Sequence, residues 1–399
     1  MKIDCDLHIH SRFSAATSSA MDLENISAGA AQKGLHVVAT GDALNKHWLE
    51  EIETLDFKKG LARLNGTTFI LTTEVEDEKR VHHLVLFKDL DSVHALRDLV
   101  KGRAPDMDVD GRPHLRMDGE EIARACHEAG AMVGPSHAFV PWTSIYKEYD
   151  SISECYGEEG IDFLELGLSA DTYLASSIGE LEGITFLSNS DAHSPQPHRL
   201  GREFNRLEVD GMSFEEIKKA ILGREGRRVV LNVGLDPRLG KYHRTACIRC
   251  YTHYSLEEAV KARWRCPGCG GRIKKGVLER IGELEDGSSS VRPPYLRIAP
   301  LAEIIAKVVG SKSVYSAKVN RLWSSLVDAF GSEIKVLIDA PIEEIKGIDE
   351  ATAGFIQLYR EGRFTIKEGG GGRYGEIVFE RPSGEKRPHG GLQKSLDLF

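Results

Sequence analysis

Three side chains near the N-terminus combine residue types that bind metals with a spacing that brings them together. Asp6, His8 and His10 alternate along an otherwise apolar segment. Successive side chains of a β-strand point to opposite faces, so a strand here would place all three on one face. Burying three polar groups on one face is unfavourable unless they bind something. Imidazole and carboxylate ligands together are typical of zinc, manganese or iron sites.

Further candidate ligands lie at or beside the ends of later apolar runs. The catalytic face of an α/β barrel is formed by the C-terminal ends of its strands, so we expect most of them to converge there. Glu74 is our candidate for a carboxylate that bridges two metals. A lone histidine such as His36 or His94 is usually an ordinary core or surface residue, unlike this set. The later candidates are Asp42, Glu74, His83, His137, Asp191 and His193.

Four cysteines indicate a second, structural metal site. Cys247 and Cys250 form one CxxC pair, and Cys266 and Cys269 form another after fifteen intervening residues. Two such pairs at this spacing predict a four-cysteine zinc ribbon. The alternative, a redox dithiol, would require a thioredoxin-like βαβ context that the surrounding sequence lacks.

The first 220 residues resemble the PHP family of phosphoesterases. The resemblance rests on DLHIH at 6–10, GD at 41–42, TTEVE at 72–76, HHLVLF at 82–87, PSHAF at 135–139 and SDAHS at 190–194. It implies a distorted seven-stranded barrel with two or three divalent metals (zinc, manganese, magnesium or iron) that hydrolyses phosphoesters. It implies ligand roles for the residues above, with His8, His10, Glu74 and Asp191 as the catalytic set.

Two details of this resemblance need a choice. Of the adjacent His82 and His83, we favour His83, because it directly precedes the apolar run. Family members often have histidine after the second-motif aspartate, whereas Ala43 follows Asp42 here. His47 or Asn45 would have to replace it at a third metal.

The elements that must position these residues alternate between short apolar runs and amphipathic stretches, such as 23–33 and 120–129. This alternation predicts βα units with a mainly parallel sheet. We therefore expect an α/β fold: a distorted (β/α)7 barrel over 1–225, a basic four-cysteine zinc domain over 226–290 and a mainly helical domain over 291–368. Residues 369–399, which begin with glycines, would form a mobile tail.

The charge distribution separates the chain into two halves. The 399 residues carry a net charge of −9, which alone argues against nucleic acid as a partner. Residues 1–223, however, hold 22 Lys and Arg against 39 Asp and Glu, whereas residues 224–275 hold 13 against 4. Basic residues interleave with Tyr242, Tyr251, Tyr254 and Trp264 around the cysteines, as on a nucleic-acid-binding surface. The alternative is a ribbon that only braces two domains.

The sequence shows no apolar run of membrane-spanning length and no signal peptide, so we expect an intracellular protein. The stretch 345–349 resembles the hairpin of helix-hairpin-helix modules, although a plain helical pack fits it equally well. The terminal QKSLDLF resembles the sliding-clamp-binding peptide, with Gln393, Leu396 and Phe399 on one helical face.

Three functions compete. The combination of barrel, zinc ribbon, helical region and clamp peptide resembles endonuclease Q, a prokaryotic family that cleaves DNA 5′ of deaminated bases (uracil, hypoxanthine, xanthine) or abasic sites. This implies a cytoplasmic, nucleoid-associated protein acting on damaged double- or single-stranded DNA. A small-molecule phosphatase of the histidinol-phosphate type would leave residues 223–399 without a purpose, and a non-catalytic clamp adaptor would be expected to have lost its metal ligands.

A lesion endonuclease must expose its target base, because stacking in the duplex hides it. Our candidates for DNA or base contact are Phe139, Trp142, Tyr146, Ser169, Asp171, Arg244, Arg263 and Lys274.

Overall fold

The strand that leads into the histidines lies inside the largest sheet of the computed structural model, which describes residues 1–379. This strand, β1 (Lys2–Asp6), pairs in parallel with β2 (Val37–Ala39) and antiparallel with β11 (Phe204–Glu208). It is buried beyond its first residue, so both of its faces are covered. The sheet has the order β15-β12-β11-β1-β2-β5-β4-β3, with β3 (Phe57–Lys58), β4 (Leu61–Leu64), β5 (Thr67–Ile70), β12 (Arg228–Gly234) and β15 (Tyr295–Arg297).

Two smaller sheets complete the strand framework of the N-terminal part. One joins β6 (Thr72–Glu76), β7 (His82–Leu86) and β8 (Met132–Pro135), all antiparallel. The other pairs β9 (Phe163–Glu165) with β10 (Thr185–Leu187) in parallel. The expectation of a mainly parallel sheet therefore needs correction, because the pairing is mixed. The link from β6 to β7 is too short for the crossover that a parallel pair requires, so these strands form a hairpin.

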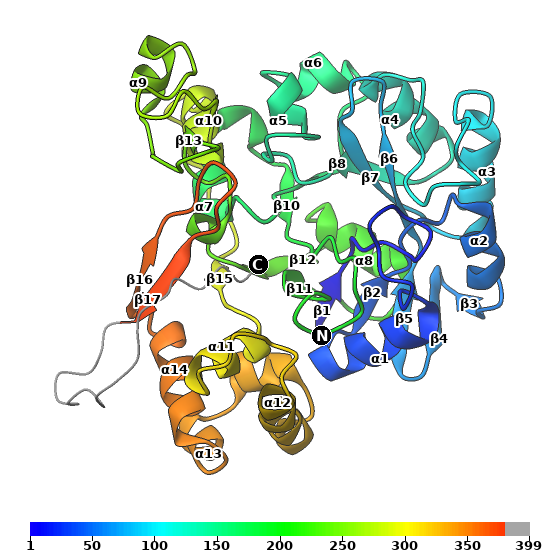
Figure 1. Cartoon of the computed structure of the whole chain (residues 1–399). Coiled ribbons are helices and arrows are strands. Elements are labelled where there is room, and N and C mark those ends of the chain that lie inside the picture. The colour runs from blue at the N-terminus through cyan, green and yellow to red at the C-terminus, as the bar shows by residue number, and fades with distance from the viewer. Residues whose placement is uncertain (380–399) are drawn as a thin grey trace, which may run out of the picture.

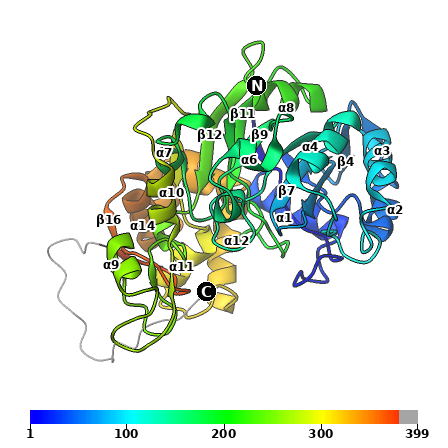
Figure 2. The ribbon, with the colours of Figure 1, turned by 90° about the horizontal axis from the view of Figure 1, so that it is seen from above.

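Helices cover the outside of these sheets (Figures 1 and 2). The first, α1 (Leu23–Lys33), begins after the capping side chain of Asp22 and ends at Gly34, whose φ of +99° is left-handed. The amphipathic stretches predicted from the sequence correspond to α1 and to α4 (Gly119–Glu128). The remaining helices of this part are α2 (Lys46–Ile52), α3 (Leu90–Val100), α5 (Ile145–Glu148), α6 (Ile152–Tyr156), α7 (Thr172–Ala175), η1 (Gly179–Leu181), α8 (Phe214–Ile221) and η2 (Pro237–Leu239).

The cysteine-containing segment and a group of helices follow, and Figure 1 shows them at the opposite side of the molecule from α2 and α3. The first comprises β13 (Ala246–Cys247), α9 (Leu256–Lys261), β14 (Ile273–Lys274) and α10 (Val277–Leu284). We call the second, residues 301–360, the helical module. It contains α11 (Leu301–Val308), α12 (Ala317–Phe330), η3 (Lys335–Asp339), α13 (Ile342–Lys346) and α14 (Glu350–Arg360).

The glycine-rich stretch departs from expectation. We predicted a mobile tail from residue 369, but β16 (Phe364–Lys367) and β17 (Glu376–Phe379) form a hairpin whose turn lies against the cysteine-containing segment. The amide of Gly369 donates to the Arg238 carbonyl, and a Cβ added at Gly371 would lie 2.5 Å from the Cys247 carbonyl oxygen. Glycine is required there because the two backbones touch.

The sequence suggested two further features of the C-terminal region, a helix-hairpin-helix module and a clamp-binding peptide. The helix-hairpin-helix resemblance corresponds to α13 and α14, but the amides of Gly347, Ile348 and Asp349 donate to carbonyls of the preceding helix. They are therefore already used within the hairpin. Gln393, Leu396 and Phe399 lie outside the described residues. Among residues 1–379, no helix is long and apolar enough to cross a membrane.

Candidate metal centre

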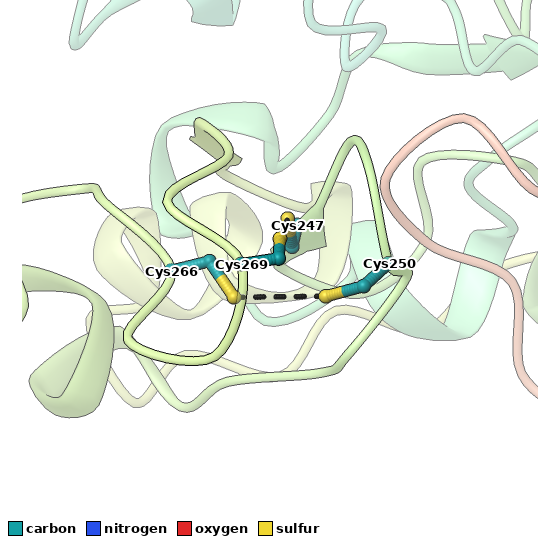
Figure 3. Close-up of side chains that lie close together, drawn as sticks. All are labelled: Cys247, Cys250, Cys266 and Cys269. Atoms are coloured by element: carbon teal, nitrogen blue, oxygen red, sulfur yellow. Dashed lines mark hydrogen bonds between the residues drawn. The ribbon is translucent and has the colours of Figure 1, made fainter.

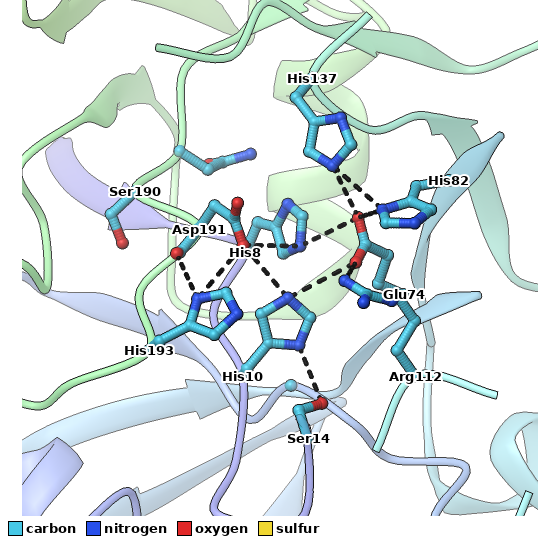
Figure 4. A network of polar contacts seen from close by, with 12 residues as sticks. His8, His10, Ser14, Glu74, His82, Arg112, His137, Ser190, Asp191 and His193 are labelled. Atoms are coloured by element: carbon cyan, nitrogen blue, oxygen red, sulfur yellow. Dashed lines mark hydrogen bonds and ion pairs between the residues drawn. The ribbon is translucent and has the colours of Figure 1, made fainter. Parts of the chain in front are cut away.

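Six side chains from distant parts of the sequence form two adjacent groups suited to metal binding (Figure 4). In each group, one possible ligand atom from every residue lies within 4.8 Å of the others. The first group contains His8, His10 and Asp191. The second contains Glu74, His82 and His137.

Glu74 lies between the two groups. Its Oε1 is 3.5 Å from His8 Nε2 and 3.2 Å from His137 Nε2. Its Oε2 is 3.5 Å from His10 Nε2 and 3.1 Å from a guanidinium nitrogen of Arg112. One carboxylate thus presents an oxygen toward each histidine of the His-x-His pair, which is the arrangement expected for a carboxylate shared by two metal ions.

A second layer of carboxylates orients the two histidines. His8 Nδ1 lies 2.9 Å from Glu165 Oε2, and His10 Nδ1 lies 3.0 Å from Asp42 Oδ1. These contacts leave the Nε2 atom of each ring directed into the cluster. Carboxylates that bind the far nitrogen of a metal-ligating histidine fix its tautomer and ring orientation.

The buried histidines and carboxylates of the cluster shift one another's pKa values strongly. Burial opposes protonation, but Glu165, Glu74 and Asp191 raise the pKa of His8 to about 9. In the reverse sense, burial alone would raise the pKa of Glu74, yet His82 and His8 lower it well below its usual value. In the absence of metal, protonated His8 therefore balances the nearby carboxylates, and a bound metal would take the place of that proton.

The residues fit a divalent metal by three observations. His8 Nε2 and His10 Nε2 are buried and have no hydrogen-bond partner among the described residues. Nitrogen and carboxylate donors converge there, a donor set that zinc, manganese and iron accept. Asp42, His137 and Asp191 have φ of 48°, 31° and 47°, a region that non-glycine residues seldom adopt. Such strain is typical of functional sites.

The structure corrects the choice between the adjacent histidines, because it brings His82 and not His83 into the cluster. His82 Nδ1 lies 3.1 Å from Glu74 Oε1. His83 is on the opposite face of β7, where its Nδ1 lies 2.6 Å from the Tyr156 hydroxyl and its Nε2 lies 3.4 Å from Asp77. The criterion of the following apolar run was wrong because both faces of this strand are buried.

Other predicted ligands take positions around the cluster. Asp42 contacts His10 and the backbone and hydroxyl of Ser11, so it supports a ligand. His193 lies beside the cluster, with its ring centroid 4.6 Å from that of His10. Asp6, which shares the predicted face, instead accepts bonds from Ser190 and Gly201.

Neither proposed substitute for the missing histidine reaches the centre. Asn45 caps α2 by accepting from the amides of His47 and Trp48. The His47 side chain is largely exposed beside Glu50. The sequence also left Glu165 and Arg112 unassigned. Glu165 was detectable as a buried acid within the apolar run 163–168, whereas Arg112 comes from an irregular loop that gives no such signal.

The four cysteines converge as their spacing predicts (Figure 3). Their sulfur atoms all lie within 4.8 Å of one another, with Cys247 and Cys269 at 3.5 Å and Cys250 and Cys266 at 3.6 Å. The Tyr254 hydroxyl lies 3.0 Å from the Cys266 sulfur and lowers the pKa of that thiol to about 6. Four thiolate donors at such separations suit a tetrahedral structural zinc.

The predicted base-contacting residues separate into buried and exposed ones. Phe139 and Tyr146 are buried and stack on each other at 5.1 Å, so their rings pack the core and do not offer a free face. Asp171 caps α7 and pairs with Arg297, and Ser169 is buried nearby. Trp142 differs, because it is 53% exposed.

Trp142 lies where the N-terminal part meets the cysteine-containing segment. Lys274 Nζ lies 4.0 Å from its ring centroid, and the Tyr242 ring stands edge-on to it at 5.7 Å. The guanidinium of Arg244, a predicted DNA contact, is already paired with Glu279 and Glu368 within the protein. Arg263 is exposed. An exposed indole beside a cation can stack on a nucleic-acid base.

Comparisons with known proteins agree over nearly the whole chain. Residues 300–363 match the family model of the MJ0043 C-terminal domain. The chain is 51% identical over 252 residues to the uncharacterized protein MJ0043 of Methanocaldococcus jannaschii, a match that spans 61% of this chain and only 32% of that longer protein. It is 32% identical over 402 residues to the uncharacterized protein YqxK of Bacillus subtilis, covering 94% and 99% of the two chains.

Two solved structures are similar throughout. One is the lesion-specific endonuclease PfuEndoQ from Pyrococcus furiosus, with a TM-score of 0.92 and 54% identity over 95% of this chain and 96% of that one. The other is endonuclease Q with a 27-mer duplex bearing an abasic lesion at the active site, with a TM-score of 0.91 and 53% identity over 95% and 97%. The likeness covers 95% of this chain, and this chain belongs to the endonuclease Q family.

Proposed function

We propose that this protein is a metal-dependent DNA endonuclease that hydrolyses the phosphodiester on the 5′ side of a deaminated base or an abasic site. The observation that supports this most strongly is the 54% identity to the lesion-specific endonuclease across 95% of the chain. The intact cluster of histidines and carboxylates supports hydrolysis as the chemistry. Uracil, hypoxanthine and xanthine are the proposed bases.

His8, His10 and Asp191 would hold one divalent metal, and His82 and His137 another, with Glu74 between them. When bound, such ions supply hydroxide from water near neutral pH and neutralise charge on the phosphoryl oxygens. Glu165 and Asp42 keep the Nε2 atoms of the two imidazoles of the His-x-His pair directed into the cluster, where the metals would bind. Arg112, partly exposed beside Glu74, is available to bind a phosphate oxygen of the substrate.

The cysteine-containing segment would contribute further DNA contacts. Its basic residues bind the phosphate backbone, and Trp142 with Lys274 provides a stacking surface. We expect affinity for DNA to fall with salt through residues 224–275. Replacing Trp142 with alanine raises KM for a uracil-containing duplex while leaving both metal sites intact, and an unchanged KM would remove this residue from the interface.

The C-terminal QKSLDLF completes the proposal as a sliding-clamp-binding peptide, with Gln393, Leu396 and Phe399 as the contact residues. Deleting residues 393–399 is expected to abolish clamp binding in a pull-down while leaving nicking of free duplexes unchanged. Equal clamp binding by the shortened chain would refute the motif.

The function is tested by incubating labelled duplexes, each with one lesion or none, with the protein and Mn²⁺, Mg²⁺ or Zn²⁺. A lesion endonuclease nicks only the damaged strands. A small-molecule phosphatase or a non-catalytic adaptor leaves every duplex intact.

A further inference from the structure

A fully buried lysine joins the end of α1 to two other parts of the molecule. Lys33 is 0% exposed, and its Nζ lies 2.8 Å from Glu333 Oε1 and donates to the Pro197 carbonyl at 3.0 Å. Lysine is among the residues least often buried in proteins unless it is paired. The three groups therefore hold one another in place.

Glu333 comes from the helical module, where it lies between α12 and η3 and is also 0% exposed. Its Oε1 accepts from the Leu301 amide at 3.2 Å, and its Oε2 accepts from the Trp323 indole at 2.7 Å. Both carboxylate oxygens are thus bonded within the module, and Oε1 also pairs with Lys33. Removing one charge of such a pair leaves the other buried without a partner.

Pro197 belongs to the segment 190–202, which begins with the metal-centre residues. The Asp191 amide donates to the His8 carbonyl at 3.0 Å, so the segment starts beside the His-x-His pair. It then lies directly against α1, because a Cβ added at Gly29 would be only 2.0 Å from the Pro195 carbonyl oxygen. Lys33 holds the same segment two residues further on.

The helical module contacts this segment directly at the next residue. His198 Nε2 lies 3.1 Å from the Tyr315 hydroxyl, and the two rings meet edge-on at 5.1 Å. Of two consecutive residues, Pro197 is thus held by Lys33, which is itself paired with Glu333, and His198 is contacted directly by the helical module. The backbone from 190 to 202 contains no helix or strand. Its beginning forms a bridge between Ala192 and Ile9, and its later part is held by turn bonds to the Gln196 carbonyl and by the contacts of Pro197 and His198.

We propose that Lys33 and Glu333 are positioning residues for the metal centre. The buried pair holds the Pro197 carbonyl and thereby fixes the segment that presents Asp191 and His193. The helical module thus shapes a site that it does not enter. This inference rests on the metal centre of the proposed function, and its test includes a readout that needs neither metal nor DNA.

The test compares Lys33→Met and Glu333→Gln with the control Asp339→Asn in the full-length protein. Asp339 Oδ1 lies 4.0 Å from a guanidinium nitrogen of Arg206, a contact between the same two parts of the molecule that does not involve the segment 190–202. Amide hydrogen exchange is followed by peptide in metal-free protein. Mn²⁺ affinity of the histidine cluster and kcat and KM for a lesion duplex are measured separately.

We expect exchange in residues 194–202 to accelerate at least tenfold in both Lys33→Met and Glu333→Gln and to stay unchanged in the Asp339→Asn control. Mn²⁺ affinity and kcat fall about tenfold, while KM and the zinc content of the four cysteines stay within twofold. If Lys33→Met does not fold, Glu333→Gln carries the test, because glutamine keeps the size of the side chain and one oxygen that can still accept from Trp323 or Leu301. Variants that match Asp339→Asn in exchange and Mn²⁺ affinity overturn the proposal. If the wild-type protein does not nick lesion duplexes, but the variants still differ from the control in exchange and Mn²⁺ affinity, only the endonuclease assignment is overturned.

Discussion

His82 Nδ1 lies 3.1 Å from Glu74 Oε1, whereas the adjacent His83 faces away from the metal centre. The register of the β6–β7 hairpin explains this difference. His82 pairs with Glu76, which shares a face with Glu74, and His83 pairs with Val75 on the other face. Residues two apart on a strand share a face, and adjacent residues point to opposite faces. A shift of one position along β7 therefore determines which histidine can bind metal.

The two histidines should therefore respond differently to substitution. Replacing His82 with alanine is expected to lower kcat for nicking by at least about 100-fold and to reduce the metal content of the cluster. Replacing His83 with glutamine removes a buried contact with Tyr156 and should lower the free energy of unfolding by about 1–3 kcal/mol, with activity within a few fold of wild type. Metal analysis, nicking kinetics and thermal unfolding would check this, and the opposite pattern would restore His83 as the ligand.

Glu165 provides a test of ring orientation. Its Oε2 lies 2.9 Å from His8 Nδ1 and accepts from the His137 amide at 3.0 Å. Changing Glu165 to glutamine keeps its size but removes the charge that orients His8, so metal affinity should fall about 10- to 100-fold. Titration with Mn²⁺ measures the change. Affinity equal to that of the wild type would mean that Glu165 does not support the cluster.

Metal binding should depend on pH. Nearby carboxylates raise the pKa of His8 to about 9 against the effect of burial, so below that pH the metal-free protein carries a proton that metal must displace. The apparent affinity for Mn²⁺ is expected to rise with pH and to level off above about pH 9, by up to about tenfold per pH unit for each proton released. Calorimetry in buffers of different ionisation enthalpy counts the protons. A constant affinity between pH 6.5 and 8.5 would contradict the protonated cluster.

The cysteine site should be structural. Cys247 is buried, and its carbonyl lies against Gly371 of the β16–β17 hairpin. Changing Cys247 to serine should release zinc, expose this segment to proteolysis and weaken DNA binding, while the histidine cluster keeps its metals. A matched change at Cys126, which is buried away from the ribbon, should leave the zinc in place. Retention of zinc and resistance to protease in the Cys247 variant would argue against a structural zinc.

Much of the site was predictable because its spacing is local. The alternation of His8 and His10 along one strand, and the two CxxC pairs, fix relative positions within a few residues. The stretch from Leu23 to Lys33 likewise carries its own cap in Asp22 and stop in Gly34.

What failed depended on contacts between elements, which the spacing of residues along one element does not reveal. His82 and His83 differ only through the register with β6, and Phe139 and Tyr146 are core residues because they stack on each other. The glycines after Lys367 suggested mobility, yet they allow a close backbone contact with Cys247. Arg112 and the Lys33–Glu333 pair, which joins residues 300 positions apart, leave no local pattern.

The histidine–carboxylate cluster is proposed to cut DNA beside a lesion. The most direct measurement maps the nick in a duplex with a single uracil, labelled at either end of the damaged strand, using the wild-type protein and Asp191→Asn in Mn²⁺. We predict one break on the 5′ side of the uracil with the wild type, no break in the undamaged duplex and at least a 100-fold slower reaction with the variant. An intact uracil duplex with metal-loaded wild-type protein, or equal cleavage by Asp191→Asn, would contradict the account.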